Sequence, residues 1–352
     1  MSPKTLWQSN STFAFALIIG TIGGGLFTWL GLPLSWMLGS MTACGLAAIL
    51  RLPISGSKRA RPPMSAIIGA MLGTQFGPDA VAGIVHWWPA LIGLTIYLLI
   101  AATLCYFYLV RIVKLDPVTG YFSAMPGGLI DMVLLGAERG GNERTIALMH
   151  SSRIFLVVFS LPPLLSLVTG IDSGTRAAAY RPLDGLVAID AAWFVFAIAA
   201  GALLGRLIRL PAPYLIGPML ASSILHWMNV TTFIVPSAVI AIAQIVLGTT
   251  VGCRFVGTAP RYILRILLTS TGSTLILLVV ALCMAFALQY VLDIPIEGIF
   301  LAFSPGGLAE MSLVALALNL EVSFVTLCHI SRIAMVVLGA SLVSRFQASR
   351  DK

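Results

Sequence analysis

Charged side chains are scarce in this sequence. Of the 352 residues only 10% are Asp, Glu, Lys or Arg, whereas soluble domains carry about 25%. Hydrophobic residues make up 59%, which excludes an ordinary water-soluble domain. The net charge of +8 does not indicate nucleic-acid binding, because the basic residues lie mostly in short connections between apolar segments, where they set membrane orientation.

Cysteine and histidine patterns typical of metal or disulfide sites are also missing. The five cysteines are scattered and none forms a C-x-x-C motif, so we expect neither a disulfide framework nor a zinc site. The four histidines form no two-His-one-carboxylate cluster in sequence, and there is no flavin motif; they are His86, His150, His226 and His329. We therefore expect no cofactor and no enzyme activity. A site in which His150 and His329 meet across a symmetry axis stays open.

Long apolar segments are what the sequence does contain. About 20 such residues cross the ~30 Å hydrocarbon core, so we predict an all-α polytopic membrane protein with a retained first span and 10 to 12 hydrophobic elements. The segments run over 12–31, 34–50, 64–85, 89–110, 117–137 and 145–169, and then over 190–208, 213–228, 236–253, 267–290, 298–318 and 323–344.

The second half of the chain repeats the first. Motifs of the first half recur 175 to 179 residues later: Leu32–Gly39 as Leu210–Gly217, Leu72-Gly73-Thr74 as Leu247-Gly248-Thr249, Pro126-Gly127-Gly128 as Pro305-Gly306-Gly307, and His150-Ser151-Ser152-Arg153 as His329-Ile330-Ser331-Arg332. We therefore divide the chain into a first repeat, 1–169, a polar linker, 170–189, and a second repeat, 190–352. Duplication of this kind is common in transporters, whose sites lie where the repeats meet.

Basic residues occupy opposite connections in the two repeats. The connection between the second and third segments is basic in the first repeat, with Arg51, Lys58, Arg59 and Arg61, but Asn229–Ser237 has no Lys or Arg. The next connection is basic only in the second repeat, with Arg254, Arg261 and Arg265. Since basic loops prefer the cytoplasm, we predict inverted repeats. Inversion needs an odd number of crossings per repeat, so the number of full crossings stays open.

Each Pro-Gly-Gly tripeptide lies within an apolar segment. Proline removes a backbone donor, and glycine easily adopts positive φ, so both segments are predicted to be broken helices that face each other near mid-membrane. Backbone groups freed in lipid need partners from protein or a wet cavity, and half-helix ends can hold a substrate or an ion. A simple packing kink is the alternative, but the matched recurrence favours a functional break.

Ionisable residues follow each break. Asp131 and Glu310 are expected in the first turn after it, where a carboxylate caps the helix or couples transport to a proton or cation. His150 and Arg153, like His329 and Arg332, share one helix face. Each arginine could contact substrate, pair with an acid as a structural lock, or snorkel to the interface. We expect Asp131 and Glu310 to lie near these arginines.

On these motifs the chain resembles the AbrB family of bacterial membrane proteins, which is also labelled as ammonia monooxygenases and tied to regulation of gene expression. The resemblance covers nearly the whole chain and implies a multi-pass protein of the cell inner membrane. The order of elements is also similar to the superfamily of cation–proton antiporters and anion transporters, which have a broken fifth element in each repeat. The paired Asp-Asp of sodium/proton exchangers is missing here, which argues against sodium exchange.

Three functions follow from these observations. The first is secondary transport of a small solute, an organic anion, by alternating access; the others are an ammonia monooxygenase-like enzyme and a membrane protein that affects gene expression. The partners are a small-molecule or ion substrate, the lipid bilayer and, as a candidate, a second copy in a homodimer. The expected site consists of Pro126, Gly127, Gly128, Asp131, His150, Arg153, Pro305, Gly306, Gly307, Glu310, His329 and Arg332.

Overall fold

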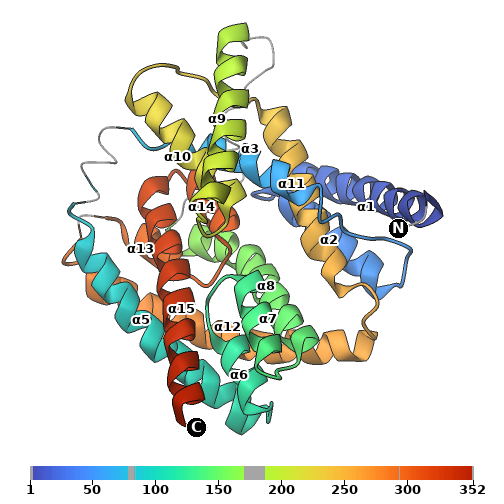
Figure 1. The fold of residues 1–352 in the computed structure, drawn as a ribbon, viewed down its shortest axis with the longest axis vertical. Coiled ribbons are helices and arrows are strands. Elements are labelled where there is room, and N and C mark those ends of the chain that lie inside the picture. Colours follow the sequence, from blue (N-terminus) through green and yellow to red (C-terminus); the bar gives the residue numbers. More distant parts are fainter. Residues whose placement is uncertain (1–2, 78–82, 84, 170–186, 293, 351–352) are drawn as a thin grey trace. The chain divides into compact units, whose positions relative to one another are not determined.

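The structure, a computed structural model, describes residues 3–77, 83, 85–169, 187–292 and 294–350, which form helices and no strands (Figure 1). The helices of the first half are α1 (Pro3–Trp29), α2 (Ser35–Ile49), α3 (Arg61–Gly73), α5 (Trp88–Phe107), the π-turn η1 (Tyr108–Ile112), α6 (Pro117–Ala124), α7 (Leu129–Glu138) and α8 (Glu143–Thr169). Those of the second half are α9 (Ala188–Leu207), α10 (Pro213–Trp227), α11 (Ser237–Gly252), η3 (Cys253–Phe255), α12 (Pro260–Leu288), α13 (Ile296–Phe303), α14 (Leu308–Ala317) and α15 (Val322–Arg350).

Seven helices among the described residues are long and apolar enough to cross a membrane. They lie within α1, α5–η1, α8, α9, α11, α12 and α15, and the shorter α2 and α14 are apolar as well. The chain therefore has the make-up of a multi-pass membrane protein. The segment expected over 64–85 is a helix only from Arg61 to Gly73, and its end, like most of the expected linker, falls outside the described residues.

The chain forms two compact units, and neither coincides with one repeat. Unit 1 comprises Met1–Gly83, Val158–Ile263 and Ser312–Ser323, whereas unit 2 comprises Ile84–Val157, Leu264–Met311 and Phe324–Lys352. Unit 1 thus collects the first three elements of both sequence halves, and unit 2 collects most of the last three. Helices far apart in the chain are neighbours within each unit.

Unit 1 is packed through glycines at matched positions. The backbones of Gly23 in α1 and Gly39 in α2 touch, and those of Gly201 in α9 and Gly217 in α10 touch in the same way. A Cβ at any of these four positions would overlap the partner backbone. Figure 1 shows α9 and α10 side by side as the yellow-green and yellow helices. Small residues allow this close approach, which is the main way apolar helices associate without a hydrophobic driving force.

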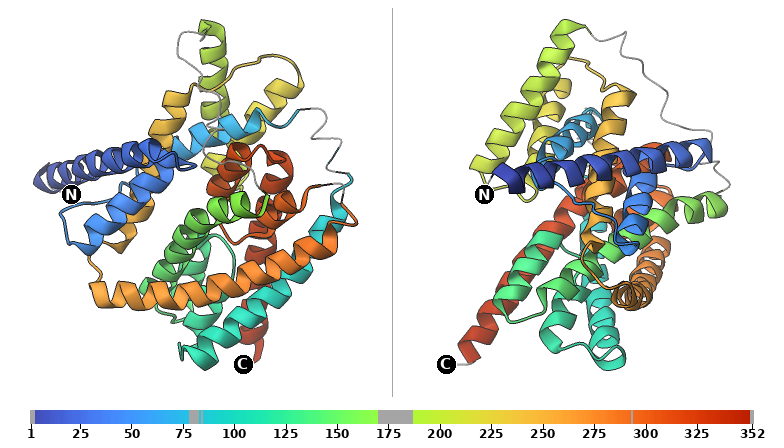
Figure 2. Two further views of the ribbon diagram at one scale, coloured as in Figure 1. Left: turned by 180° about the vertical axis from the view of Figure 1, so that it is seen from behind. Right: turned by 90° about the vertical axis from the view of Figure 1, so that its right-hand side faces the viewer.

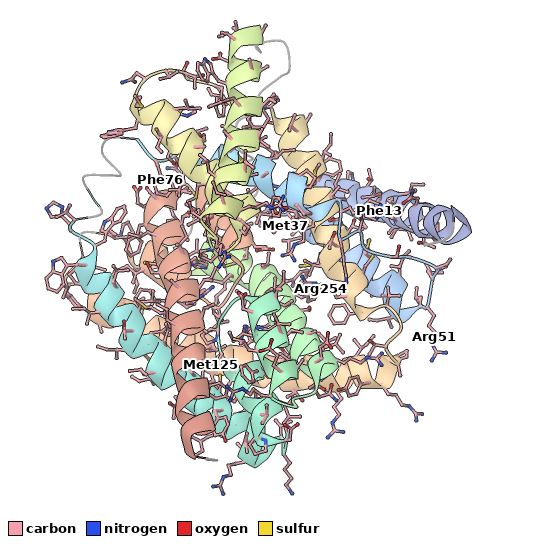
Figure 3. All side chains as sticks on the ribbon, viewed as in Figure 1. Phe13, Met37, Arg51, Phe76, Met125 and Arg254 are labelled. Carbon is pink, nitrogen blue, oxygen red and sulfur yellow. The ribbon has the colours of Figure 1, made fainter. Side chains whose placement is uncertain are left out.

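Unit 1 also joins the second helix of one half to the third helix of the other. Gly69 of α3 lies against the carbonyl of Leu215 in α10, and Gly248 of α11 lies against the carbonyl of Met37 in α2. Figure 3 labels Met37 on α2. Farther along, Gly73 meets the Met219 carbonyl, so α3 and α10 run parallel.

Unit 2 brings α5 and α12, the fourth elements of the two halves, into contact. Gly93 lies against Leu288, and the Cys105 thiol donates to the Ser273 carbonyl at 3.4 Å. Residue numbers rise along α5 as they fall along α12, so the two helices are antiparallel; α12 is the long orange helix of Figure 2. Around this pair, unit 2 holds α6, α7, α13 and most of α15.

Candidate functional site

All twelve residues expected at the site lie in unit 2. The two Pro-Gly-Gly tripeptides separate α6 from α7 and α13 from α14. Asp131 and Glu310 lie in the first turns of α7 and α14. The His-x-x-Arg motifs lie on α8 and α15.

Proline decides where the first half-helix ends. A residue before proline is pushed out of the helical region by the proline ring. Accordingly Met125 (φ −62°, ψ 126°) and Ser304 (φ −60°, ψ 142°) are extended, and α6 and α13 end one residue earlier. The next half-helix begins three residues after each proline. We call the segments Met125–Gly128 and Ser304–Gly307 the first and second breaks.

The glycines of the breaks are needed for space and not for positive φ. Gly128 has φ −63°, and no glycine of either break adopts positive φ, so of the two reasons the sequence offers for glycine, positive φ is wrong and the absence of a side chain holds. A Cβ on Gly128 would overlap the Asp131 carboxylate, and one on Gly307 would overlap that of Glu310. Each acid therefore folds back over the glycine that precedes its helix.

This position is the one that a capping acid occupies. Asp131 and Glu310 are each the third residue of their helix, the position from which the acid of a capping box reaches back to the N-cap. A negative charge is also favoured at a helix N-terminus. Both side chains are only partly buried. The position of the acids fits capping, the first of the two roles expected for them, and coupling to a proton or cation stays a prediction.

The buried arginines cap the opposite half-helix ends. Arg153 donates from both Nη1 and Nη2 to the Met125 carbonyl at 3.3 Å. Arg332 donates to the Ser304 carbonyl at 2.6 Å and to the Gly306 carbonyl at 2.5 Å. Met125 and Ser304 are equivalent positions, 179 residues apart. Figure 3 labels Met125 at the end of α6. Carbonyls at a helix C-terminus carry partial negative charge and favour a cation.

The predicted pairing of these arginines with the acids is wrong for this structure. Among the described residues neither Arg153 nor Arg332 is within ion-pair distance of Asp131 or Glu310, and their guanidinium groups bond to backbone carbonyls and to His150. The physical reason is the break itself. Each break presents a negative end and a positive end, so the cation and the carboxylate go to different ends.

The two histidines differ in their hydrogen bonds. His150 Nδ1 is 2.7 Å from Arg153 Nη2, and His150 Nε2 is 2.9 Å from the Phe122 carbonyl. Because arginine only donates, Nδ1 accepts and Nε2 carries the proton. His329 Nδ1 instead donates to the Val325 carbonyl at 3.1 Å, and its Nε2 has no partner in the part of the chain that the structure describes. His150 is thus held in one neutral tautomer and His329 uses the other ring nitrogen as donor.

The two breaks lie close together in unit 2. A Cβ on Gly127 would meet Val336 of α15, one turn beyond Arg332. Arg153 and Arg332 are within electrostatic range of each other and of Tyr97 on α5. The sequence did not single out Tyr97, because α5 also contains Tyr106 and two threonines and no motif distinguishes Tyr97 from them.

The described residues contain no group of three or more His, Cys, Asp or Glu placed to hold a metal ion. In particular, both ring nitrogens of His150 are engaged with Phe122 and Arg153. A metal site formed by His150 and His329 would require His150 to give up one of these hydrogen bonds. What the arrangement offers is a pair of buried cations at two helix ends.

The fold and the site define a class: a multi-pass helical membrane protein with two broken helices, each capped by a buried arginine. The family model described as "Transition state regulatory protein AbrB" matches residues 36–348, and the chain belongs to this AbrB family. It is 26% identical to "Uncharacterized protein YhjN" of Bacillus subtilis (strain 168), covering 91% of this chain and 89% of that protein. It is 24% identical to "Putative regulator AbrB" of Escherichia coli (strain K12), covering 98% and 97%.

Proposed function

We propose that this protein is a secondary transporter of a small organic anion in the cell inner membrane, working by alternating access. One observation carries the proposal: two buried arginines lie within electrostatic range of each other at the ends of two broken helices, and neither has a carboxylate partner among the described residues. Buried cations are costly in a membrane protein and mark substrate or ion pathways. An anion that binds between them offsets their repulsion.

The helix directions support inverted repeats. Helices α5 and α12 are the fourth elements of the two halves, and they are antiparallel. Equivalent helices run in opposite directions when one repeat is inserted upside down. The basic residues, which occupy opposite connections in the two repeats, also indicate inversion. Inversion lets the two breaks exchange roles as the site opens to either side of the membrane.

Transport is tested with purified protein in proteoliposomes. We expect uptake of at least one acid from a panel of acetate, lactate, succinate and glutamate, above that of empty liposomes. Arg153→Lys keeps the charge but loses the planar fork, so we expect uptake to fall at least about tenfold. Arg265→Lys, at an exposed position of α12, is the matched control and should transport like the wild type. No uptake of any acid would contradict the proposal.

Inversion is tested separately by labelling. Single cysteines at Ser57 and Asn229, in a variant without the five native cysteines, should react from opposite sides of the membrane. These residues lie in the equivalent connections α2–α3 and α10–α11. Reaction of both from one side would show parallel repeats.

Regulation of gene expression is the second candidate, favoured by the names of the family model and of the Escherichia coli relative. In our proposal any such effect is indirect, through the concentration of the transported solute. Arg153→Lys should then abolish the transcriptional effect together with transport. A transcriptional effect that persists without transport would favour a direct sensor.

A further inference from the structure

Buried polar atoms without partners are concentrated in unit 2. Of nine such side-chain atoms among the described residues, seven belong to unit 2. Folded proteins satisfy most buried polar groups, so each exception calls for an explanation. Four of the seven belong to ring or guanidinium groups around the two breaks: Arg153 Nε, Arg332 Nε, His329 Nε2 and the Tyr97 hydroxyl.

Tyr97 is the most informative of these residues. Its side chain is fully buried in the middle of α5. Its ring packs edge-to-face on Phe303 with centroids 5.7 Å apart, and Phe303 directly precedes the second break. A phenylalanine would make the same ring contact. Leaving a buried hydroxyl without a partner destabilises the folded protein, so packing alone does not account for the tyrosine.

The surroundings of the hydroxyl are cationic. Tyr97 interacts electrostatically with both Arg332 and Arg153. Each arginine uses its Nη groups on a break and leaves Nε–H unbonded. Of the four free groups, three are thus donors, namely two N–H groups on cations and one O–H group, and the fourth, His329 Nε2, is an acceptor. Such a set is complementary to an acceptor-only group with negative charge, and a carboxylate supplies two acceptor oxygens.

We propose that the carboxylate of a small organic acid binds between Arg153 and Arg332 and accepts a hydrogen bond from the Tyr97 hydroxyl. This inference rests on the transport function proposed above and assigns its substrate group and a specificity-determining residue. The arginine Nη groups hold the two half-helix ends, and the Nε groups and the phenol hold the ligand. One anion thereby links the breaks of both repeats.

Binding is measured on the full-length protein in detergent, by thermal shift and by calorimetry. Acetate, succinate and citrate are the probes, and acetamide is the neutral analogue of acetate. We expect at least one acid to raise the melting temperature and acetamide to leave it unchanged. An equal shift with acetamide, or no shift with any of the three acids, would overturn the proposal.

Tyr97→Phe separates a ligand contact from a packing role, because it removes only the hydroxyl. We expect unchanged or higher thermal stability and about tenfold weaker binding of the acid, the effect of one hydrogen bond to a charged group. Tyr106→Phe, on the same helix, is the matched control and should bind like the wild type. Wild-type affinity in Tyr97→Phe would overturn the assignment of Tyr97.

The two proposals fail in distinguishable ways. Binding that depends on Tyr97, without uptake into proteoliposomes, supports the carboxylate site and contradicts transport. Uptake of an acid with wild-type affinity in Tyr97→Phe supports transport and places the carboxylate elsewhere.

Discussion

The two breaks have the same design and different detail. In both, proline ends a half-helix, an acid lies in the first turn of the next one, and an arginine on the following helix bonds to the carbonyl before the proline. In the first break Arg153 makes two bonds of 3.3 Å to one carbonyl, and His150 supports it at 2.7 Å. In the second, Arg332 bonds to two carbonyls at 2.6 and 2.5 Å without help from His329.

The features that both breaks share are the ones a broken helix requires, and the features that differ are specific to each repeat. Helix ends of fixed partial charge demand a cation on one side and an anion on the other, and both repeats supply them. The histidine is not part of that demand. In the first break, where the bonds from Arg153 to the carbonyl are long, His150 accepts a hydrogen bond from the arginine. In the second break, where the bonds from Arg332 are short, His329 makes no bond to the arginine and, among the described residues, its Nε2 stays free. The second break is therefore held more firmly by its arginine.

The largest difference is expected from removing the arginines. Arg332→Met removes two charge-assisted hydrogen bonds and leaves the Ser304 and Gly306 carbonyls without that partner. We expect it to lower the free energy of unfolding by about 3 kcal/mol, and Arg153→Met to lower it by about 2 kcal/mol. Reversible unfolding in mixed micelles measures both. A larger loss for Arg153→Met would reverse the comparison.

A smaller effect is expected from filling the space beside the capping acids. Gly307→Ala displaces the Glu310 carboxylate and should cost about 1–2 kcal/mol. Glu310→Ala removes the overlap, so the double variant should lose less than the sum of the two single variants by at least about 0.5 kcal/mol. Gly128→Ala, Asp131→Ala and their double variant form the equivalent double-mutant cycle in the first break.

The control for these alanines is Gly25→Ala in α1, because nothing lies within 4 Å of a Cβ there. It should be neutral or stabilising by up to about 1 kcal/mol, the helix propensity gained. Additive losses in both cycles would show that the acids do not occupy the space beside the glycines.

The smallest difference is expected between the histidines. His150→Phe takes a partner from Arg153 and from the Phe122 carbonyl, so it should cost about 1.5 kcal/mol. His329→Phe removes one bond to the Val325 carbonyl and should cost less than about 1 kcal/mol. Melting temperatures of the two variants in one detergent give the comparison. Equal losses would mean that the different hydrogen bonds have no energetic consequence.

Much of the candidate site could be predicted from the sequence because it depends on local chemistry. Proline before a glycine pair ends a helix wherever it occurs in the chain, and the third residue of the next helix reaches its cap. These relations span a few residues, so the sequence alone places Pro126 at the break and Asp131 in the turn that follows. The helix ends of the membrane segments were predicted less well: the fourth segment of the second half begins at Pro260 instead of 267.

The partners of the arginines could not be predicted in the same way. Arg153 is 28 residues from Met125, and nothing in that spacing tells a carbonyl from a carboxylate as its partner. Tyr97 is separated by even more residues of sequence from Arg153 and Arg332, which lie near it in the structure. Buried polar groups choose partners by position in space, and sequence patterns report only faces and ends of single helices.

Composition, the repeated motifs and the proline-glycine pairs were enough, by themselves, to determine a duplicated helical membrane protein with a break in each half. Those features reflect backbone sterics and the cost of placing polar groups in lipid, which act residue by residue. Only the tertiary structure showed that each compact unit contains helices from both halves of the chain, and that each arginine caps a helix end. These outcomes depend on which helices pack together, and that is decided by close contacts such as Gly69 with Leu215, between residues far apart in the chain.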